Sequence, residues 1–281
     1  MNELAWVDFL KKHTPKTKRV IAGIGEDCAV IANGKGYLLL SSDLFIENVH
    51  FKLGEISLKN LGARAVARAF SDVIACAGIP EFLGVSIGIP SGVTLRDLKS
   101  IYAGIKEYCR RLNVSFVGGD TSRAKILFMD IWVVGKAKKC ILRSTARIGD
   151  YVFITGVLGK LKFNQVFKLR VEEIQTLVSN FKLNAMIDIS DGFILDLWRI
   201  LRESKKGALI YADDIPVTVS RNDIFRGEDY ELIFTVSGDQ DINYLKKKYF
   251  LVGKIKEKSF GYKIKANNKI KDIKVKGFTH F

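Results

Sequence analysis

Six aspartates stand in short motifs rich in Gly, Ser and Thr, and they are the residues of this chain best suited to chemistry. They are Asp27 in GIGEDCAV, Asp43 in SSDLFIENVHF, Asp72 in FSDV, Asp120 in VGGDTSR, and Asp188 and Asp191 in MIDISDGF. Glycine lets the backbone approach a ligand closely, and carboxylate oxygens are hard ligands suited to Mg²⁺. The motifs therefore predict a site that holds metal ions between the protein and phosphate groups.

Each motif also has an ordinary structural interpretation, because an isolated Asp beside Gly, Ser or Thr is most often a turn residue or a helix N-cap. The number and setting of the motifs favour function. Asp43, Asp120 and Asp188 each follow an apolar run, so we expect them where a strand ends and a loop opens. Converging carboxylates repel by about 4 kcal/mol per close pair at an effective dielectric of 20, and a bound divalent metal removes that penalty.

No nucleotide-binding loop of a common type accompanies these motifs. The segment GVLGK has the wrong spacing for a Walker A motif, and a cysteine stands where the GIG motif would need the third glycine of a dinucleotide fingerprint. The protein-kinase signature set is also missing. If ATP binds, it must therefore be held mainly through metals, and Asp43, Asp120, Asp188 and Asp191 could clamp Mg²⁺ at an inter-domain cleft.

The elements that must position the aspartates follow from the apolar spacing. The first domain, 1–136, is expected to contain helices at 2–13, 57–77 and 95–111, a hairpin at 29–43 around Asn33-Gly34, and strands at 82–89, 114–117 and 126–135. The second domain, 137–281, is expected to contain strands at 151–155, 185–188, 208–211, 230–236, 249–255 and 261–276, helical stretches over 160–180, and a helix at 192–203. The pattern predicts an α/β (mixed α+β) fold in two closely packed domains, with mixed sheets and flanking helices.

Composition limits the class of protein. With 281 residues, of which 48% are hydrophobic, the chain can form one large or two medium domains. The four cysteines are widely spaced and form no CxxC pair, which indicates neither a zinc site nor a disulfide framework and favours a reducing cytoplasm. Lys11 and Lys12 interrupt the N-terminal apolar stretch, and no run of about 18 apolar residues exists, so we expect neither a signal peptide nor a membrane span.

The basic excess lies late in the chain. The net charge is +15, and residues 246–276 hold twelve Lys against two acids. Over 262–276 Lys alternates with apolar residues, which indicates a strand with one face in water. A nucleic-acid-binding module is the alternative from a different class, because a basic face attracts phosphates. Arg and interleaved aromatics are scarce there, which favours the solvated face.

In order along the chain, the blocks GIGEDCAVI, SSDLFIENVHF, VGGDTSR, RSTARIGDYVFITGVLG, AMIDISDGFILDL, GEDYELIFTV and the terminal GFTHF resemble the thiamine-monophosphate kinase family. That family belongs to the PurM-like (aminoimidazole ribonucleotide synthetase-related) superfamily, and the resemblance spans nearly the whole chain. VHF, DISDG and GEDYEL together point to this branch of it. Relatives with a reactive Cys or selenocysteine near the N-terminus fit less well because no such residue is evident here. Relatives that end in a functional Cys fit less well because this chain ends in Phe281.

The resemblance implies the two-domain PurM-like ATP-binding fold and an ATP-dependent enzyme that phosphorylates thiamine monophosphate to thiamine diphosphate by direct in-line transfer. It also implies several Mg²⁺ ions, a homodimer built from the first domains, and ATP in the cleft between domains. An attacking phosphate monoester is largely unprotonated at pH 7, so such an enzyme needs charge neutralisation and no general base. The runner-up is a related reaction in which ATP activates an amide or formyl oxygen.

The resemblance also assigns individual residues. The metal ligands or their supports are Asp27, Ser41, Ser42, Asp43, Asp72, Asp120, Asp188 and Asp191. The nucleotide contacts are Tyr102, Gly119, Asp120, Arg143 and Ser190, and Asp43, Asp120 and Arg143 are the catalytic set. The thiamine-side contacts are His50, Glu228 and Phe278, the last preferred to Phe281. Two departures from the family pattern are a short segment between Gly159 and Asn184 and, where GEDYEL begins, an Arg226-Gly227 pair in place of Gly-Gly.

Overall fold

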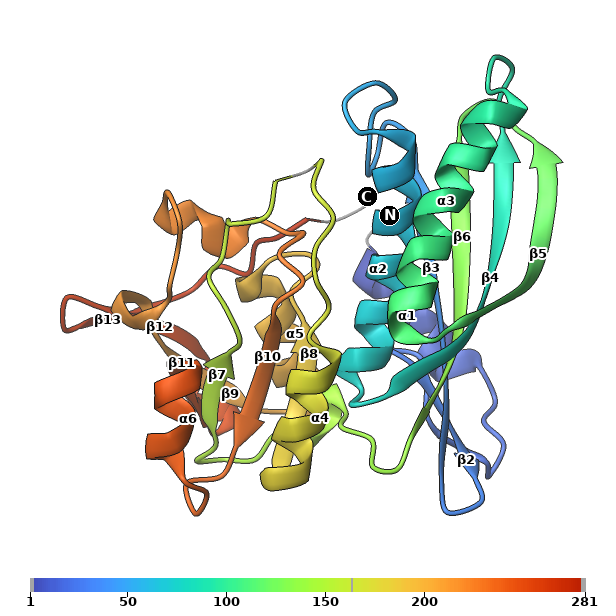
Figure 1. Cartoon of the computed structure of the whole chain (residues 1–281). Helices are drawn as coiled ribbons and strands as arrows, with labels where there is room; N and C mark the ends of the chain where they lie inside the picture. The colour runs from blue at the N-terminus through green and yellow to red at the C-terminus, as the bar shows by residue number, and fades with distance from the viewer. Residues whose placement is uncertain (1–2, 163, 279–281) are drawn as a thin grey trace. The chain divides into compact units, whose positions relative to one another are not determined.

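The computed structural model describes residues 3–162 and 164–278, and its contacts divide the chain into two units (Figure 1). Unit 1 comprises residues 1–27, 141–161 and 172–281, and unit 2 comprises residues 28–140 and 162–171. The main stretch of unit 2 ends at Cys140, near the boundary at residue 136 that the sequence predicts. Each unit also takes a short segment from the other half of the sequence.

Unit 2 is built from strands and two long helices. Its strands are β2 (Ala29–Asn33), β3 (Gly36–Ile46), β4 (Ile79–Ile89), β5 (Ser115–Arg123) and β6 (Phe128–Ala137), and its helices are α2 (Leu58–Ala75) and α3 (Leu95–Leu112). The strands follow the order β2-β3-β6-β4-β5, in which β4 and β5 are parallel and the other pairs antiparallel. The hairpin expected around Asn33-Gly34 is confirmed, with Gly34 at φ 59°.

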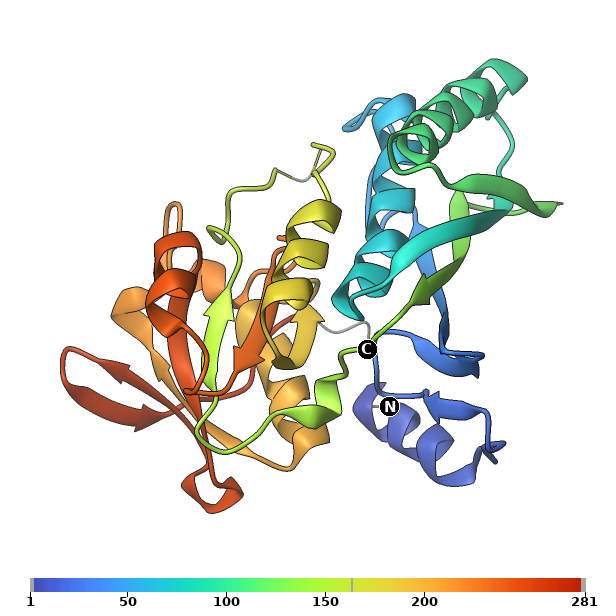
Figure 2. The same cartoon turned by 60° about the horizontal axis from the view of Figure 1, so that its bottom comes forward.

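Both helices of unit 2 lie on one face of these strands, as Figures 1 and 2 show. Alternate side chains along β3 and β6, such as Leu39 and Ile131, are buried beneath them. On the opposite face Leu40, Leu44 and Phe82 are exposed. Because successive side chains of a strand point to opposite faces, one face of the sheet is covered by the helices, and the other is open and partly apolar.

The segment 162–171 belongs to unit 2 because the two helices bind its main chain. The fully buried Arg64 of α2 donates to the carbonyl of Gln165 and lies 5.8 Å from the Phe167 ring centre. Tyr108 of α3 donates its hydroxyl to the carbonyl of Phe167, at 2.5 Å. These carbonyls are therefore held by side chains of other helices. The expectation of helical stretches over 160–180 is right only from residue 171 onward, where α4 (Val171–Asn180) begins.

Unit 1 contains a seven-stranded mixed sheet of order β13-β12-β9-β11-β7-β10-β8. The strands are β7 (Tyr151–Ile154), β8 (Leu183–Asp188), β9 (Gly207–Tyr211), β10 (Leu232–Val236), β11 (Phe250–Lys256), β12 (Tyr262–Ala266) and β13 (Lys269–Asp272). Besides α4, the helices are α1 (Glu3–His13), α5 (Phe193–Ser204) and α6 (Ile242–Lys248). Short pieces complete the chain: β1 (Val20–Ala22), η1 (Arg143–Thr145), η2 (Ala212–Asp214), η3 (Arg221–Phe225) and η4 (Lys258–Phe260).

The core of unit 1 lies between the sheet and α5, where Ile154, Ile187, Phe193, Leu197 and Ile233 are completely buried. Helix α1 is joined to α5 by two ion pairs, Lys11 with Glu203 and Arg202 with Asp8. These pairs explain why the N-terminal segment belongs to unit 1, which the sequence does not indicate.

Two differences from the sequence prediction concern local structure in unit 1. The single strand expected over 261–276 is a hairpin of β12 and β13, because Asn267 and Asn268 form its turn with φ of 48° and 61°. Asn tolerates this left-handed conformation better than most residues. Helix α6 was not expected, although Asp241 caps it by accepting from the Tyr244 N–H at 2.9 Å.

The predicted fold class is confirmed: the chain combines two mixed sheets with flanking helices in an α/β (α+β) arrangement. Among the residues that the structure describes, no helix has both the length and the apolar character needed to cross a membrane.

Candidate functional site

Asp27 lies in unit 1 just before β2 and is held by Arg143 of η1. The guanidinium contacts both carboxylate oxygens, with Nε 3.0 Å from Oδ2 and Nη2 2.5 Å from Oδ1. The Arg143 main-chain N–H donates to Glu26 Oε2 at 2.6 Å. A two-pronged pair of this kind fixes both position and orientation. Two predicted site residues, Asp27 and Arg143, are thus in direct contact.

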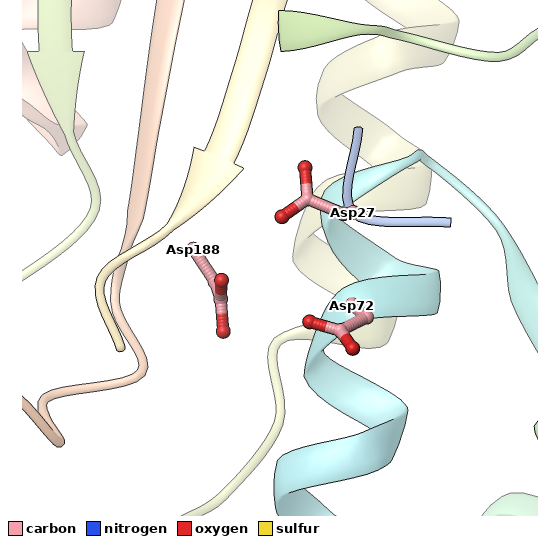
Figure 3. A group of neighbouring side chains, drawn as sticks. All are labelled: Asp27, Asp72 and Asp188. Atoms are coloured by element: carbon pink, nitrogen blue, oxygen red, sulfur yellow. The ribbon is translucent and has the colours of Figure 1, made fainter. Parts of the chain in front are cut away.

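Asp188 is the last residue of β8 and is buried in unit 1. Asp27 and Asp188 each offer a carboxylate oxygen, and these two atoms lie within 4.8 Å of each other. A divalent cation bound to both would sit about 2.0–2.6 Å from each oxygen, so this spacing fits a cation with little movement. Figure 3 draws the two carboxylates together with that of Asp72, which α2 carries in unit 2.

Within unit 2, β3 and α2 bring four polar side chains together. Ser41 donates to Asp72 Oδ2 at 2.5 Å, and the Arg68 Nε lies 3.1 Å from Asp43 Oδ2. Ser41 and Asp43 share the face of β3 that α2 covers, since they are two residues apart. Ser42 points to the opposite face and donates to Asp130 of β6 at 2.5 Å. The structure therefore does not bring Ser42 together with Ser41, Asp43 and Asp72.

The expectation that Asp43 and Asp120 lie at strand ends is wrong. Asp43 pairs with Ile131 inside β3, and Asp120 pairs with Ser86 inside β5. Both strands continue because the neighbouring strands β6 and β4 supply hydrogen-bond partners beyond the apolar runs. Asp188 alone of the three ends its strand as expected.

Asp120 lies on the open face of unit 2, in the row of Ser86 and Asp130, and its Oδ1 accepts from the Thr121 N–H at 2.8 Å. The preceding Gly119 has φ 150°, and a Cβ there would lie 1.8 Å from the Val85 carbonyl oxygen. Only glycine fits this backbone approach. Asp120 therefore lies on the opposite face of the sheet from Asp43, whereas Gly119 pairs with Val85 in the row that contains Ile131 and Asp43.

Tyr102 of α3 is half exposed and meets Phe116 of β5 edge to face, with ring centres 5.9 Å apart. Phe116 is itself exposed and lies three residues before Gly119. Two of the predicted nucleotide contacts, Tyr102 and Gly119, thus come from neighbouring elements of unit 2.

Asp191 lies in the loop between β8 and α5, where it shares Arg199 with Asp196. Arg199 Nη1 lies 2.6 Å from Asp191 Oδ2 and 2.6 Å from Asp196 Oδ1. Asp196 Oδ2 accepts from the N–H groups of Asp191 and Gly192, at 2.9 and 3.1 Å. Burial raises the pKa of Asp196, and the Arg199 guanidinium opposes that rise. The network holds the Asp191 loop on the first turn of α5.

The same loop gathers three other predicted residues of unit 1. The Glu228 N–H donates to the Ser190 carbonyl at 2.8 Å, and the Phe278 N–H donates to the Asp191 carbonyl at 2.9 Å. Phe278 is 43% exposed, so its ring is accessible to a ligand. The alternative aromatic, Phe281, lies outside the described residues.

His50 is buried in unit 2, where its ring stacks on Phe45 with centres 5.9 Å apart. Its Nδ1 accepts from the Ile46 N–H at 3.0 Å. An acceptor Nδ1 places the proton of a neutral imidazole on Nε2, which is then the nitrogen able to donate to a ligand.

Sequence reasoning missed the partners of the aspartates: Arg68, Asp196 and Arg199. Helical spacing carries a signal for two of them. Arg68 precedes Asp72 by four residues, so both lie on one face of α2, and Arg199 follows Asp196 by three residues on α5. The bond from Arg68 to Asp43 joins two elements and has no local signal in the sequence.

Comparison with known proteins identifies the family to which this chain belongs. Residues 25–137 match the family model for the AIR synthase related protein, N-terminal domain. The curated thiamine-monophosphate kinase of Buchnera aphidicola subsp. Acyrthosiphon pisum is 33% identical, over 97% of this chain and 96% of that protein. The chain belongs to the thiamine-monophosphate kinase family.

Other members of the thiamine-monophosphate kinase family agree in sequence and in fold. The enzyme of Bacillus subtilis is 30% identical over 98% of both chains. The solved structure of AaThiL complexed with AMPPCP and TMP matches the fold with a TM-score of 0.86 at 24% identity, covering 100% of this chain and 97% of that one. The family resemblance of the motifs and the predicted PurM-like fold are thereby confirmed.

Proposed function

We propose that this chain uses ATP to phosphorylate thiamine monophosphate to thiamine diphosphate. The observation that carries the proposal is the pair Asp27 and Asp188, whose carboxylate oxygens approach within 4.8 Å in a chain that is similar along nearly its whole length to thiamine-monophosphate kinases. AaThiL, which shares this fold, is complexed with AMPPCP and TMP. Both halves of the proposed substrate pair thus have a counterpart in a protein of the same fold.

The carboxylates fit magnesium, since the donor set consists of hard oxygens at a spacing that suits a divalent cation. The proposed ligands and supports are Asp27, Ser41, Asp43, Asp72, Asp188 and Asp191, together with Ser42 and Asp120 on the opposite face of the unit 2 sheet, which would serve other Mg²⁺ ions. Bound Mg²⁺ ions would supply charge neutralisation at the transferring phosphoryl group. Arg143 and Arg199 hold Asp27 and Asp191 by their guanidinium groups, so each aspartate already has a cationic partner.

For the reaction itself we propose direct in-line transfer with Asp43, Asp120 and Arg143 as the catalytic set, in which Asp43 and Asp120 act from opposite faces of the unit 2 sheet. The attacking phosphate monoester has a second pKa near 6, so most of it carries no proton on the attacking oxygen at pH 7. The work left to the protein is to position two polyanions and offset their charge. Arg143 suits this role because its planar guanidinium matches phosphate geometry.

The nucleotide is proposed to contact Tyr102, Gly119, Asp120, Arg143 and Ser190, and the thiamine side to contact His50, Glu228 and Phe278. Two observations support the second set. The His50 Nδ1 accepts from the Ile46 N–H, so a neutral imidazole carries its proton on Nε2, the kind of donor that suits a phosphate oxygen. The Phe278 ring is exposed beside the Asp191 loop, where it is able to stack on a cationic thiazolium.

We further propose that the protein is a cytoplasmic homodimer, in which the regions 1–136 and 137–281 both contribute to each ATP and substrate site. Leu40, Leu44 and Phe82 support the dimer, because the open face of unit 2 exposes these apolar side chains to solvent. Light scattering at micromolar concentration tests it, and a fully active monomer would contradict it.

The test of function is an assay of ADP and thiamine diphosphate with ATP, thiamine monophosphate and Mg²⁺ each varied. We expect ADP formation to require all three and to match thiamine diphosphate mole for mole. If ADP formation does not depend on thiamine monophosphate but requires an amide or formyl acceptor, the proposal is wrong. The related reaction, in which ATP activates an amide or formyl oxygen, would then be the activity.

A further inference from the structure

Asp229 is a buried aspartate of unit 1 whose two carboxylate oxygens lie in different surroundings. Oδ1 accepts from the Gly159 main-chain N–H at 2.7 Å. Oδ2 is also buried, yet no donor among the described residues reaches it. Leaving a buried polar atom unpaired costs about 1–3 kcal/mol, so a simple core position would not keep this residue. Asp229 is 8% exposed and is not among the residues proposed for metal, nucleotide or substrate.

The backbone on both sides of Asp229 is in the left-handed region. Glu228 has φ 71° and Tyr230 has φ 50°, which is uncommon for residues other than glycine. Their N–H groups donate to the loop after β8, Glu228 to Ser190 at 2.8 Å and Tyr230 to Ile189 at 2.9 Å. Each such residue costs about 1–3 kcal/mol, and the strain persists only where surrounding contacts hold it.

The sheet explains why these segments meet. Strand β10 lies between β7 and β8 and is antiparallel to both, so the segment before β10 shares an edge with the loops that follow β7 and β8. The segment 226–231 is bound to the β8 loop by its main chain. It is bound to the 156–159 loop after β7 by the Asp229 carboxylate. Asp229 is thus one of three side chains that join the segment 226–231 to the chain after β7, beside Arg226, whose Nη2 donates to the Leu161 carbonyl at 3.2 Å, and Glu231. Of the three, Asp229 is the one that binds a main-chain N–H of the 156–159 loop.

A cation site is a weaker interpretation of this acidic corner, because the neighbouring carboxylates already have donors. Glu231 Oε2 accepts from the Thr155 hydroxyl at 2.6 Å. Asp223 Oδ2 accepts from the N–H groups of Val219 and Ser220, at 3.2 and 3.1 Å. The Asp229 Oδ2 atom is therefore not part of a group of carboxylates available to bind a cation.

We propose that Asp229 is a positioning residue, which ties the segment carrying Glu228 to the 156–159 loop and thereby sets where the Glu228 carboxylate meets the thiamine half of the substrate. The assignment rests on the proposed function, since that function gives Glu228 its substrate. Tyr230 strengthens the link, because its hydroxyl donates to Glu228 Oε1 at 3.3 Å. Any shift of the segment moves both residues together.

The charges and donors around the Asp229 carboxylate are consistent with this positioning role. Burial raises the pKa of Asp229 to about 7, against the lowering by the Gly159 N–H and by Arg226, and Glu231 and Asp223 raise it further. A protonated carboxyl keeps its acceptor for the Gly159 N–H and buries no charge. Asparagine keeps the same shape and the same acceptor, so Asp229→Asn preserves the tie and Asp229→Ala removes it.

The experiment compares Asp229→Ala and Asp229→Asn with Asp150→Asn. Asp150 is a matched control, because it is a buried aspartate of unit 1 whose oxygens are held by the Arg147 N–H, Asn184 and Thr235. We expect Asp229→Ala to raise the KM for thiamine monophosphate at least tenfold, with the KM for ATP within twofold. Asp229→Asn restores most of the loss, and Asp150→Asn lowers the Tm without changing either KM.

Hydrogen exchange supplies a readout that does not depend on activity. The Gly159 amide exchanges faster in Asp229→Ala than in the wild type and is protected again in Asp229→Asn. If the alanine variant does not fold, Asp229→Ser replaces it in both measurements, since a serine hydroxyl is too short to reach the Gly159 N–H without a shift.

Two results would overturn the assignment, and they differ from a failure of the proposed function. An active wild type with unchanged KM for thiamine monophosphate in the folded alanine or serine variant removes the positioning role alone. An equal rise in both KM values does the same, because it indicates general loosening. A wild type that makes no thiamine diphosphate removes the proposed function, and this assignment with it.

Discussion

The two units hold their acidic side chains by different means. In unit 2, Asp43 lies inside strand β3 and Asp72 inside helix α2. Arg68 of α2 contacts Asp43, and Ser41 of β3 donates to Asp72. In unit 1, Asp188 ends a strand and Asp191 lies in a loop that is fixed by the network of Asp196 and Arg199. Regular backbone thus carries Asp43, Asp72 and Asp188, whereas the position of Asp191 depends on the side-chain network of its loop.

The difference predicts how each unit responds to substitution. Strand and helix geometry in unit 2 does not depend on the acidic side chains, so changing one should alter function and leave stability nearly intact. In unit 1 the side chains also hold the loops in place, so changing one should alter both.

The largest effect is expected for Asp43→Asn in unit 2. Asparagine keeps an oxygen for Arg68 but loses the charge, so we expect turnover to fall about 10²–10³-fold, the size typical for removal of an electrostatic group at a reacting centre. The Tm of the protein without ligand should change little, while most of the rise in Tm produced by Mg-ATP should disappear. Glu81→Gln, which removes an exposed carboxylate from β4, is the control. If the variant has normal activity and a normal rise in Tm with Mg-ATP, Asp43 does not take part in metal binding or catalysis.

In unit 1 we expect Arg199→Gln to lower the free energy of unfolding by about 3–5 kcal/mol, the usual cost of leaving a buried charge without its partner. Asp196 is completely buried and would lose its counter-charge. Urea unfolding measures the change, and the double variant Arg199→Gln with Asp196→Asn should recover part of it. A single variant as stable as the wild type would show that the unit 1 network does not hold its loop.

The pH dependence of stability gives a third test, also in unit 1. Burial raises the pKa of Asp229 to about 7, so the folded state keeps a proton that the unfolded chain loses near pH 4. Wild-type stability should therefore fall relative to Asp229→Asn as pH rises from 4 to 7. Between pH 5 and 8 the difference amounts to about 2–3 kcal/mol in urea unfolding. A constant difference across that range would mean that the carboxyl is ionised throughout.

The smallest effect is expected in unit 2 for Tyr108→Phe, which removes the hydrogen bond to the Phe167 carbonyl. The loss should be about 1 kcal/mol in the free energy of unfolding. Burial raises the pKa of Tyr108 to about 12, so the hydroxyl stays protonated and the loss should be the same at pH 6 and pH 9. A loss of stability that differs between pH 6 and pH 9 would contradict the prediction that the Tyr108 hydroxyl stays protonated.

Periodicity predicted most elements of both units because the signals are local. Helix α2 and strand β8 follow directly from apolar spacing, and the Gly-flanked aspartates identified the candidate site. What the sequence could not give were contacts between distant segments, such as Arg68 with Asp43 or Tyr108 with the Phe167 carbonyl. The position of Asp43 inside its strand depends on pairing with β6, which no local pattern encodes.

Direct transfer of the phosphoryl group to thiamine monophosphate is the central claim, and isotope transfer tests it most directly. The protein is incubated with Mg²⁺, thiamine monophosphate and ATP labelled with ³²P at the γ-phosphate, and the products are separated after less than one turnover. The account predicts that the label appears in thiamine diphosphate, one equivalent for each ADP formed, with none released as inorganic phosphate. Label found in inorganic phosphate while thiamine monophosphate remains unchanged would contradict it.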